Sequence, residues 1–386
     1  MTPKRILIFS LAYHPLVGGA EIAVKEITDR IAPSEFSFDM LTLRFHAQDK
    51  RYEKIGNVGV YRIGFPALSA PLNKRFFPFM AFIAARRLHV SNTYDAIWAI
   101  MANYAGFGAV FFKMTHSRIP FLLTLQEGDP IDYIKKRVRF VYPLFVRIFT
   151  KADFIQAISR YLGNFARDMG FTGPLTVVPN GVDAKHFSQT YPSEVLRELA
   201  VRLHKKENDV FLITASRLVT KNAVGDIIAA LQFLPKHMKL LITGTGPLER
   251  ELKLPVTSYQ LQDRVLFLGH INHAELPKYL QISDVFVRPS LSEGMGNSFV
   301  EAMAAGIPII ATPVGGIVDF LKDGETGLFC EVKNPKSIAE KVLFLQEHTD
   351  ARSTMVANAR KMVTEKYDWN IVTKDMKDIF KTVCVS

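Results

Sequence analysis

Short apolar runs alternate with longer mixed segments along this chain, and the alternation predicts strands that are each followed by a helix. The runs are bounded by glycine, proline or polar residues, as buried strands usually are. They cover residues 4–10, 38–43, 58–63, 96–100, 120–125 and 154–158, and then residues 210–216, 239–243, 265–268 and 285–287. This order favours an α/β protein with two doubly wound, Rossmann-like domains facing a central cleft.

A change in local composition predicts where the two domains meet. Residues 176–183 (TVVPNGVD) read as a strand followed by a turn, in which proline and glycine mark a break between regular elements. We therefore expect a first domain over residues 1–183 and a second over residues 184–366. A last helix is expected over residues 367–384.

The stretch 288–316, RPSLSEGMGNSFVEAMAAGIPIIATPVGG, carries the clearest chemical signal. A buried strand leads into a loop that contains Gly294 and Gly296, and an Ala- and Met-rich helix follows until Gly306. Strand, glycine loop and helix in this order present free backbone N–H groups at a helix N-terminus, where a phosphate binds well.

Two carboxylates, Glu293 and Glu301, bracket this anion site. Carboxylates do not bind phosphate, but they accept hydrogen bonds from sugar and ribose hydroxyls. For Glu301 an alternative stays open, in which an acid near the first helical turn interacts favourably with the helix dipole. The pair around two glycines predicts a nucleotide-sugar site.

Two cations follow the strand at residues 210–216. In SRLVTKN, Arg217 and Lys221 lie beyond the strand's carboxyl end, where they could converge on one diphosphate. The alternative is that both are ordinary surface cations.

Together these motifs resemble the retaining glycosyltransferases of family 4, which have the two-domain GT-B fold. The resemblance rests on the E-x7-E pattern of SEGMGNSFVEAMAAGIPIIATPVGG, on the R-x3-K of SRLVTKN, and on VVPNGVD, which is similar to the family's interdomain hinge. It extends over nearly the whole chain. It also implies that the last helix packs back onto the first domain.

The resemblance implies a set of site residues, carried over motif by motif. Donor-binding residues are expected at Gly18, Gly19, Arg217, Lys221, Gly244, Gly269, Glu293, Gly294, Met295, Gly296, Asn297, Ser298 and Glu301. Arg217, Lys221, Glu293 and Glu127 are the expected catalytic residues. Gly244 lies in GTGPLE, which lacks the third glycine of a dinucleotide fingerprint, and Gly269 borders the expected base pocket.

Two loops of the first domain are further candidates. In YHPLVGGAE, Gly18 and Gly19 allow a close approach of backbone to a ligand, and the alternative is that they only form the tight strand-to-helix turn. Gln126, Glu127 and Asp129 follow the strand at 120–125 and are expected to contact the acceptor. Many relatives carry a histidine there, and Asp129 could instead cap a helix that starts near Pro130.

Composition narrows the setting of the protein. The chain has 386 residues, of which 48% are hydrophobic, so it is globular rather than disordered. Its two cysteines, Cys330 and Cys384, have neither disulfide nor metal spacing, which favours a reducing cytoplasm. The start of the chain reads as a first strand and not as a signal peptide, and no apolar run is long enough to span a membrane.

The positive charge is concentrated in the first half. Residues 1–188 hold 24 Lys and Arg against 14 Asp and Glu, a net charge of +10, while the remainder holds 24 against 23. Segments 66–90 and 134–151 combine cations with aromatic side chains such as Phe76 and Phe77, a pattern typical of binding to anionic lipid. The cations expected at the membrane are Lys74, Arg75, Lys135, Lys136, Arg137 and Arg139. Ordinary helices with solvated charges are the alternative, and no nucleic-acid-binding motif accompanies the charge.

The hypothesis is therefore a glycosyltransferase on the inner face of the plasma membrane. It would move a sugar from a UDP- or GDP-sugar to a glycan or lipid-linked acceptor during polysaccharide, lipopolysaccharide or glycolipid synthesis. The sequence has no D-x-D pair, so we expect neither a metal nor another cofactor. The alternatives are a sugar-nucleotide epimerase on the same fold and a non-catalytic binder of lipid or nucleic acid.

Overall fold

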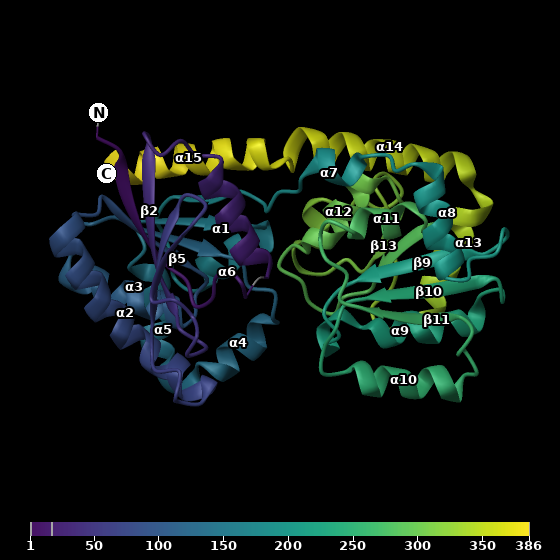
Figure 1. Ribbon diagram of the computed structural model, residues 1–386, viewed down its shortest axis with the longest axis horizontal. Helices are drawn as coiled ribbons and strands as arrows, with labels where there is room; N and C mark the ends of the chain where they lie inside the picture. Colours follow the sequence, from purple (N-terminus) through teal and green to yellow (C-terminus); the bar gives the residue numbers. More distant parts are fainter. Residues whose placement is uncertain (1, 17, 386) are drawn as a thin grey trace. The chain divides into compact units, whose positions relative to one another are not determined.

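The computed structural model describes residues 2–16 and 18–385, which form two compact α/β units (Figure 1). The first unit consists of the residues up to Asn180 together with those from Trp369 onward, and the second unit is Gly181–Asp368. The division expected from sequence, after residue 183 and before residue 367, differs from this one by three and two residues.

The first unit is built on an eight-stranded sheet with the order β3-β4-β2-β1-β5-β6-β7-β8. All neighbouring strands are parallel except β3 and β4, which form an antiparallel hairpin at one edge. The strands are β1 Lys4–Phe9, β2 Phe36–Leu43, β3 Tyr52–Ile55, β4 Val58–Ile63, β5 Ala96–Ile100, β6 Phe121–Leu125, β7 Phe154–Ala157 and β8 Leu175–Val177. The central strands are buried on both faces, which explains their unbroken apolar sequence.

The helices of the first unit cover both faces of this sheet. They are α1 Gly19–Asp29, α2 Ala70–Asn92, α3 Tyr104–Thr115, α4 Ile131–Arg137, α5 Tyr142–Thr150, α6 Arg160–Asp168 and α15 Trp369–Val385, with a 3₁₀ turn η1 at Arg139–Val141. On one face α3 packs between α2 and α5, and on the other α1 packs against α15.

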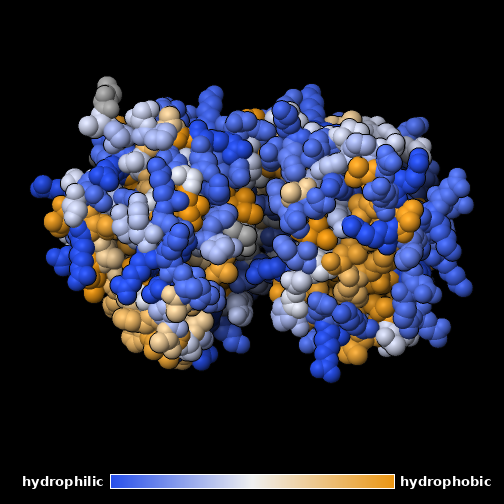
Figure 2. All heavy atoms as spheres, in the orientation of Figure 1, coloured by the Kyte–Doolittle hydropathy of each residue, from blue (hydrophilic) through white to orange (hydrophobic). Residues whose placement is uncertain are grey.

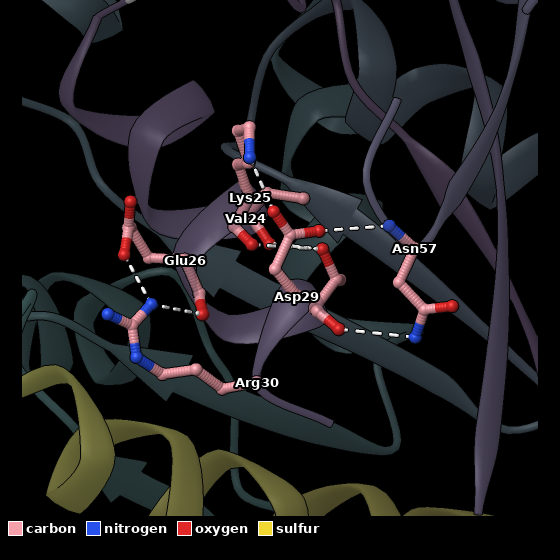
Figure 3. Close-up of polar contacts among 7 residues, drawn as sticks. Val24, Lys25, Glu26, Asp29, Arg30 and Asn57 are labelled. Carbon is pink, nitrogen blue, oxygen red and sulfur yellow. Dashed lines mark hydrogen bonds and ion pairs between the residues drawn. The ribbon is translucent and has the colours of Figure 1, made fainter. Parts of the chain in front are cut away.

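The hairpin of β3 and β4 was not expected from sequence, and its turn holds the end of α1 (Figure 3). Asn57 donates from its side chain to the carbonyls of Thr28 and Ile31, and its backbone N–H donates to Asp29. Gly56 has a φ of +56°, and a Cβ there would lie 1.9 Å from the Asp29 carboxylate. The turn therefore adds hydrogen-bond donors to carbonyls at and just beyond the C-terminus of α1.

The last helix belongs to the core of the first unit, as the resemblance implied. Phe380 of α15 packs edge-on against Trp98 of β5 at 5.0 Å between ring centroids and against Phe38 of β2 at 5.7 Å. Trp369, Val372 and other buried side chains continue this contact along α15.

The second unit contains a six-stranded parallel sheet with the order β11-β10-β9-β12-β13-β14. Its strands are β9 Val210–Ala215, β10 Met238–Thr243, β11 Val265–Gly269, β12 Val285–Arg288, β13 Ile309–Ala311 and β14 Leu328–Phe329. From β9 the chain proceeds outward to one edge, and from β12 it proceeds outward to the other. The neighbours β9 and β12 therefore flank the topological switch point, where α/β sheets commonly bind ligands.

The helices of the second unit connect and cover these strands. They are α7 Ala184–Ser188, α8 Ser193–Arg202, α9 Val224–Ala230, α10 Glu249–Ser258, α11 Leu276–Gln281, α12 Asn297–Ala305, α13 Pro335–Glu347 and α14 Thr349–Lys366, with 3₁₀ turns η2 Thr220–Asn222, η3 Leu231–Phe233 and η4 Gly315–Asp319. The helix expected at 299–305 thus begins at Asn297, and it ends where Gly306 adopts a φ of +81°.

Replacing Phe380 with alanine should destabilise the first unit by about 3–5 kcal/mol, because it removes a fully buried aromatic side chain. Both tryptophans of the chain, Trp98 and Trp369, lie in this core, so their fluorescence during a urea titration reports the unfolding of the first unit. Val385→Ala is the matched control, since Val385 is 86% exposed on the same helix. An unchanged urea midpoint for Phe380→Ala would contradict the observed packing of α15.

Candidate functional site

Most of the predicted donor residues lie at the carboxyl ends of β9 and β12. We call residues 217–222, which follow β9, the cation loop, and residues 289–296, which follow β12, the glycine loop. The two loops are joined directly, because the backbone N–H of Leu291 donates to the carbonyl of Lys221 at 2.7 Å. Arg217 is exposed and Lys221 is half-buried. The cation loop and the glycine loop thus lie side by side in the second unit, and the convergence of Arg217 and Lys221 on one diphosphate stays a prediction.

A buried asparagine strengthens the connection between the loops. Asn222 is 2% exposed, and its Nδ2 donates to the carbonyl of Arg217 at 2.7 Å. Its Oδ1 accepts a hydrogen bond from Nη2 of Arg288 at 3.0 Å. The amide therefore links the backbone of the cation loop to the last residue of β12.

Glu293 is 7% exposed and forms an ion pair with Nη2 of Arg288. Its other oxygen, Oε1, accepts from the backbone N–H of Gly294 at 3.2 Å. The sequence analysis proposed that Glu293 holds a donor sugar. The structure adds that Arg288 fixes the orientation of its carboxylate. Arg288 was not identified as a site residue from sequence.

Glycines allow several of these segments to approach one another backbone to backbone. Gly315 has a φ of +56°, and a Cβ there would lie 1.9 Å from the carbonyl oxygen of Glu293. The same carbonyl accepts from Gly316 N–H at 3.0 Å. At Gly244, φ is +127° and a Cβ would lie 2.0 Å from the carbonyl oxygen of Ser216, whereas Gly269 faces open space. Close packing of the backbone in the second unit therefore explains Gly315 and Gly244.

The N-terminus of α12 lies at the end of the glycine loop. Gly296, with a φ of +89°, precedes the helix, and Asn297 and Ser298 form its first turn. The side chain of Met295 is buried, and so is Gly294. The side chain of Met295 therefore contributes to the core of the second unit, and its contact with a donor stays a prediction.

Glu301 occupies the second turn of α12, so its interpretation as a first-turn dipole partner is wrong. Its Oε1 lies 3.3 Å from Nε2 of His273, to which the sequence analysis gave no role. His273 in turn packs edge-on against Phe187 of α7, with 4.9 Å between ring centroids. The side chain of Glu301 on α12 thus contacts the segment that precedes α11.

A hydrogen bond within the first unit partly explains the glycine turn after β1. The backbone N–H of Gly18 donates to Oε2 of Glu21 at 2.7 Å, so this N–H is already paired with the first turn of α1. Gly19 is the first residue of that helix. Both glycines follow the strand as expected, and the tight turn alone accounts for the position of Gly18.

Glu127, after β6, is a buried carboxyl group. Its Oε1 accepts from the backbone N–H of Ala102 at 2.5 Å, and its Oε2 has no hydrogen-bond partner among the described residues. Burial raises the pKa of Glu127 from 4.5 to about 7, against an opposing effect of the hydrogen bond from Ala102. Such a group can exchange a proton near neutral pH.

Gln126 and Asp129, the predicted site residues near Glu127 in sequence, are less buried than Glu127. Gln126 is half-buried and accepts at Oε1 from Nδ2 of Asn180 at 3.2 Å. Asp129 is also half-buried. The residue that precedes α4 is Pro130, so the alternative in which Asp129 caps this helix is wrong.

The predicted membrane-contact residues lie on two parts of the first unit. Lys74 and Arg75 are in α2, while Lys135, Lys136, Arg137 and Arg139 are in α4 and η1. An exposed apolar stripe runs along α2, and Figure 2 shows hydrophobic residues gathered over this region. Its members, which are 42% to 58% exposed, are Leu72, Phe76, Phe79 and Ile83. Phe77, which the sequence analysis counted with them, is fully buried.

Two kinds of feature are absent from residues 2–16 and 18–385. These residues contain no group of three or more His, Cys, Asp or Glu side chains arranged to hold a metal ion. They also contain no helix with the length and apolar character needed to span a membrane.

A cavity of about 360 Å³ lies against the cation loop, whose residues Val219 and Thr220 line part of it. Val219, Thr220, Val224, Leu248, Leu252 and Leu291 are among the residues that line it. Its charged groups are Asp226 and Lys333, of opposite sign, and no predicted donor residue lines it. Its walls are mostly apolar and its two charged groups are of opposite sign, so the cavity does not suit a diphosphate.

Two family models match the chain in succession. Residues 17–186 match the model described as Glycosyltransferase Family 4, and residues 197–362 match the model described as Glycosyl transferases group 1. Together they cover most of the chain, and each falls largely within one unit. The chain belongs to glycosyltransferase family 4.

Relatives of this family 4 glycosyltransferase include proteins with lipids in their names. An uncharacterized glycosyltransferase of Methanocaldococcus jannaschii is 25% identical over 397 residues, covering 98% of each chain. The alpha-monoglucosyldiacylglycerol synthase of Acholeplasma laidlawii is 27% identical over 212 residues, 54% of this chain and 52% of that protein. A GDP-mannose-dependent alpha-(1-6)-phosphatidylinositol monomannoside mannosyltransferase of Mycobacterium tuberculosis is 28% identical over 246 residues, 61% and 63% respectively.

Solved structures of glycosyltransferases share the fold. Sucrose-phosphate synthase from Thermosynechococcus elongatus superposes with a TM-score of 0.84 at 20% identity, covering 98% of each chain. Anabaena HepE in complex with UDP and glucose superposes with a TM-score of 0.80 at 20% identity, covering 98% of this chain and 100% of that one. The predicted family and the predicted GT-B fold are therefore confirmed.

In this glycosyltransferase the sequence analysis missed the residues that hydrogen-bond to the predicted site residues and hold them in place. Arg288, Asn222, His273 and Ala102 contact predicted site residues but were not predicted themselves. Arg288 had a usable signal, because it is a single cation at the end of the apolar run VFVR, five positions before Glu293. Ala102 acts through its backbone, which sequence does not mark.

Glu127 should make the first unit less stable as pH rises from about 4.5 to about 7. In this range the carboxyl group of the unfolded chain ionises, while the folded chain keeps it protonated. Ionisation therefore lowers the free energy of the unfolded state relative to the folded state, and the free energy of unfolding falls. The expected loss is up to about 3 kcal/mol, and it stays constant above pH 7.

Glu127→Gln removes this dependence, since an amide does not ionise. The difference in urea midpoint between Glu127→Gln and the wild type, followed by tryptophan fluorescence, should be larger near pH 8 than near pH 4.5. A difference that is the same at both pH values would show that Glu127 titrates normally.

Proposed function

We propose that this glycosyltransferase transfers a hexose from a UDP- or GDP-sugar to a glycan or lipid-linked acceptor, with retention of the anomeric configuration. The proposal rests on one observation above all. The cation loop and the glycine loop are hydrogen-bonded to each other at the carboxyl ends of the two central strands of the second unit. One relative is named for its use of GDP-mannose, and one similar structure holds UDP and glucose, which supports both nucleotides.

Breaking the bond between a sugar and a diphosphate leaves negative charge on the diphosphate. In the proposed reaction Arg217 and Lys221, together with the backbone N–H groups at the start of α12, stabilise that charge. Glu301 accepts hydrogen bonds from the ribose hydroxyls and Glu293 from those of the donor sugar. These cations and amides would do the work that a divalent ion does elsewhere, and we propose that no metal is required.

Retention follows if the acceptor attacks from the side that the diphosphate leaves. The bond from the anomeric carbon to the phosphate oxygen then breaks as the bond to the acceptor oxygen forms. The departing phosphate takes the acceptor's hydroxyl proton. Glu127, with Gln126 and Asp129, would contact the acceptor or the sugar from the first unit.

We further propose that the first unit rests on the cytoplasmic face of the plasma membrane. The exposed apolar stripe of α2 and the cations of α2, α4 and η1 fit an anionic lipid surface, since apolar side chains enter the interface while cations meet lipid phosphates. The names of two relatives, with diacylglycerol and phosphatidylinositol products or acceptors, are consistent with a lipid-linked acceptor.

Arg217→Ala should reduce kcat for transfer by roughly 100- to 1,000-fold, because it removes a cation that stabilises the leaving diphosphate. Release of nucleoside diphosphate from UDP-glucose or GDP-mannose measures the reaction, with and without a membrane-lipid extract as acceptor. Arg197→Ala is the control, because Arg197 is an exposed cation on α8 of the same unit. Product formed without acceptor and without diphosphate release would favour the epimerase.

Neutralising Lys135, Lys136, Arg137 and Arg139 to glutamine should weaken flotation with vesicles rich in phosphatidylglycerol by at least about 100-fold. Each cation near an anionic surface contributes about 1 kcal/mol, and the loss should shrink with added salt. The control neutralises four exposed lysines of the second unit: Lys236, Lys336, Lys361 and Lys366. Equal flotation of both variants would remove this surface from the proposal.

A further inference from the structure

Arg288 is a buried guanidinium group at the carboxyl end of β12. The residue is 8% exposed, and its partners come from three different segments of the second unit. Nη2 donates to Asn222 Oδ1 at 3.0 Å and pairs with Glu293 Oε2, and Nη1 donates to Ser298 Oγ at 2.9 Å. The guanidinium plane also lies against Phe299, 5.2 Å from the ring centroid.

These partners are the segments that carry the proposed donor residues. Asn222 belongs to the cation loop and holds the carbonyl of Arg217 at 2.7 Å. Glu293 belongs to the glycine loop, and Ser298 lies in the first turn of α12. Arg288 therefore contacts each of these three segments, while the backbone hydrogen bond from Leu291 N–H to the carbonyl of Lys221 joins the cation loop to the glycine loop independently of it.

Stability alone is a poor explanation for such a group. A buried ion pair gives little or no net stability compared with well-packed apolar side chains, because both charges must lose their water. What the pair does provide is geometry, because the planar guanidinium fixes several partners at once. The neighbouring strand residues Val285 and Val287 show that apolar side chains are accommodated in β12.

We propose that Arg288 is a positioning residue for donor-sugar recognition, which it supports by fixing the carboxylate of Glu293. This inference rests on the proposed function. With Oε2 directed towards Arg288 and Oε1 bonded to Gly294 N–H, the carboxylate has one orientation and keeps acceptor capacity for hydroxyl groups. The energy that the sugar adds to nucleotide binding should then depend on Arg288, while binding of the nucleotide itself should not.

The test compares affinities for a nucleoside diphosphate and for its sugar derivative. Calorimetric titrations with UDP, UDP-glucose, GDP and GDP-mannose give the ratio of the two Kd values, which measures the sugar's contribution. The variants are Arg288→Met, Arg288→Lys, Glu293→Gln and the double variant Arg288→Met with Glu293→Gln. Thermal unfolding of each variant accompanies the titrations.

Arg288→Met should lower the sugar's contribution by roughly 10- to 100-fold and leave the Kd for the diphosphate nearly unchanged. The double variant should match Glu293→Gln, because Arg288 acts through that carboxylate. Arg288→Lys keeps a charge beside Glu293 but cannot reach all partners, so it should fold and still lose part of the sugar's contribution. It carries the test if Arg288→Met does not fold.

Three results would overturn the inference. In the first, Arg288→Met or Arg288→Lys keeps the full contribution of the sugar while Glu293→Gln loses it. In the second, an Arg288 variant weakens diphosphate and sugar nucleotide equally along with a lower unfolding temperature, which is a purely structural effect. In the third, the wild type binds none of the sugar nucleotides, which refutes the proposed function itself and leaves Arg288 no sugar to recognise.

Discussion

The ion pair between Arg288 and Glu293 is the interaction on which the orientation of the glycine loop's carboxylate depends. It is buried at the switch point between β9 and β12, and its hydrogen bonds extend to Asn222 and Ser298. Loops that follow parallel strands have no ladder of their own to fix them. Here a single guanidinium group, assisted by backbone bonds such as that from Leu291 to Lys221, gives them a defined arrangement.

Glycine complements this polar network with close contact. The carbonyl of Glu293 is approached so closely by Gly315 that a Cβ there would overlap it, and Gly244 approaches Ser216 in the same way. Glu293 is therefore held at two places, its carboxylate by Arg288 and its backbone carbonyl by the turn at Gly315 and Gly316. A preorganised acceptor of this kind loses little entropy when it binds a hydroxyl group.

Much of the fold was predictable, because parallel strands buried on both faces leave unbroken apolar runs in the sequence. The runs at 58–63 and 96–100 coincide with β4 and β5, and the motif order led to the GT-B fold. The edge strand β3 was missed because its alternating sequence, YEKI, is short and half polar. In the site, loop residues with a recognisable spacing could be predicted, whereas their supports could not. Asn222 and Ala102 act through contacts that depend on tertiary structure and leave no pattern in the chain.

The second unit contains more contacts among its proposed site residues than the first unit does. The second unit has a set of cations, amides and carboxylates on neighbouring loops, and the first has Glu127, a buried carboxyl group with one oxygen that no described residue hydrogen-bonds. Hydrogen–deuterium exchange on the intact chain, with and without saturating UDP-glucose or GDP-mannose, tests the central claim most directly. The account predicts that a sugar nucleotide slows exchange at backbone amides of residues 217–222 and 290–298. Protection confined to other segments, or no protection by any sugar nucleotide, would contradict it.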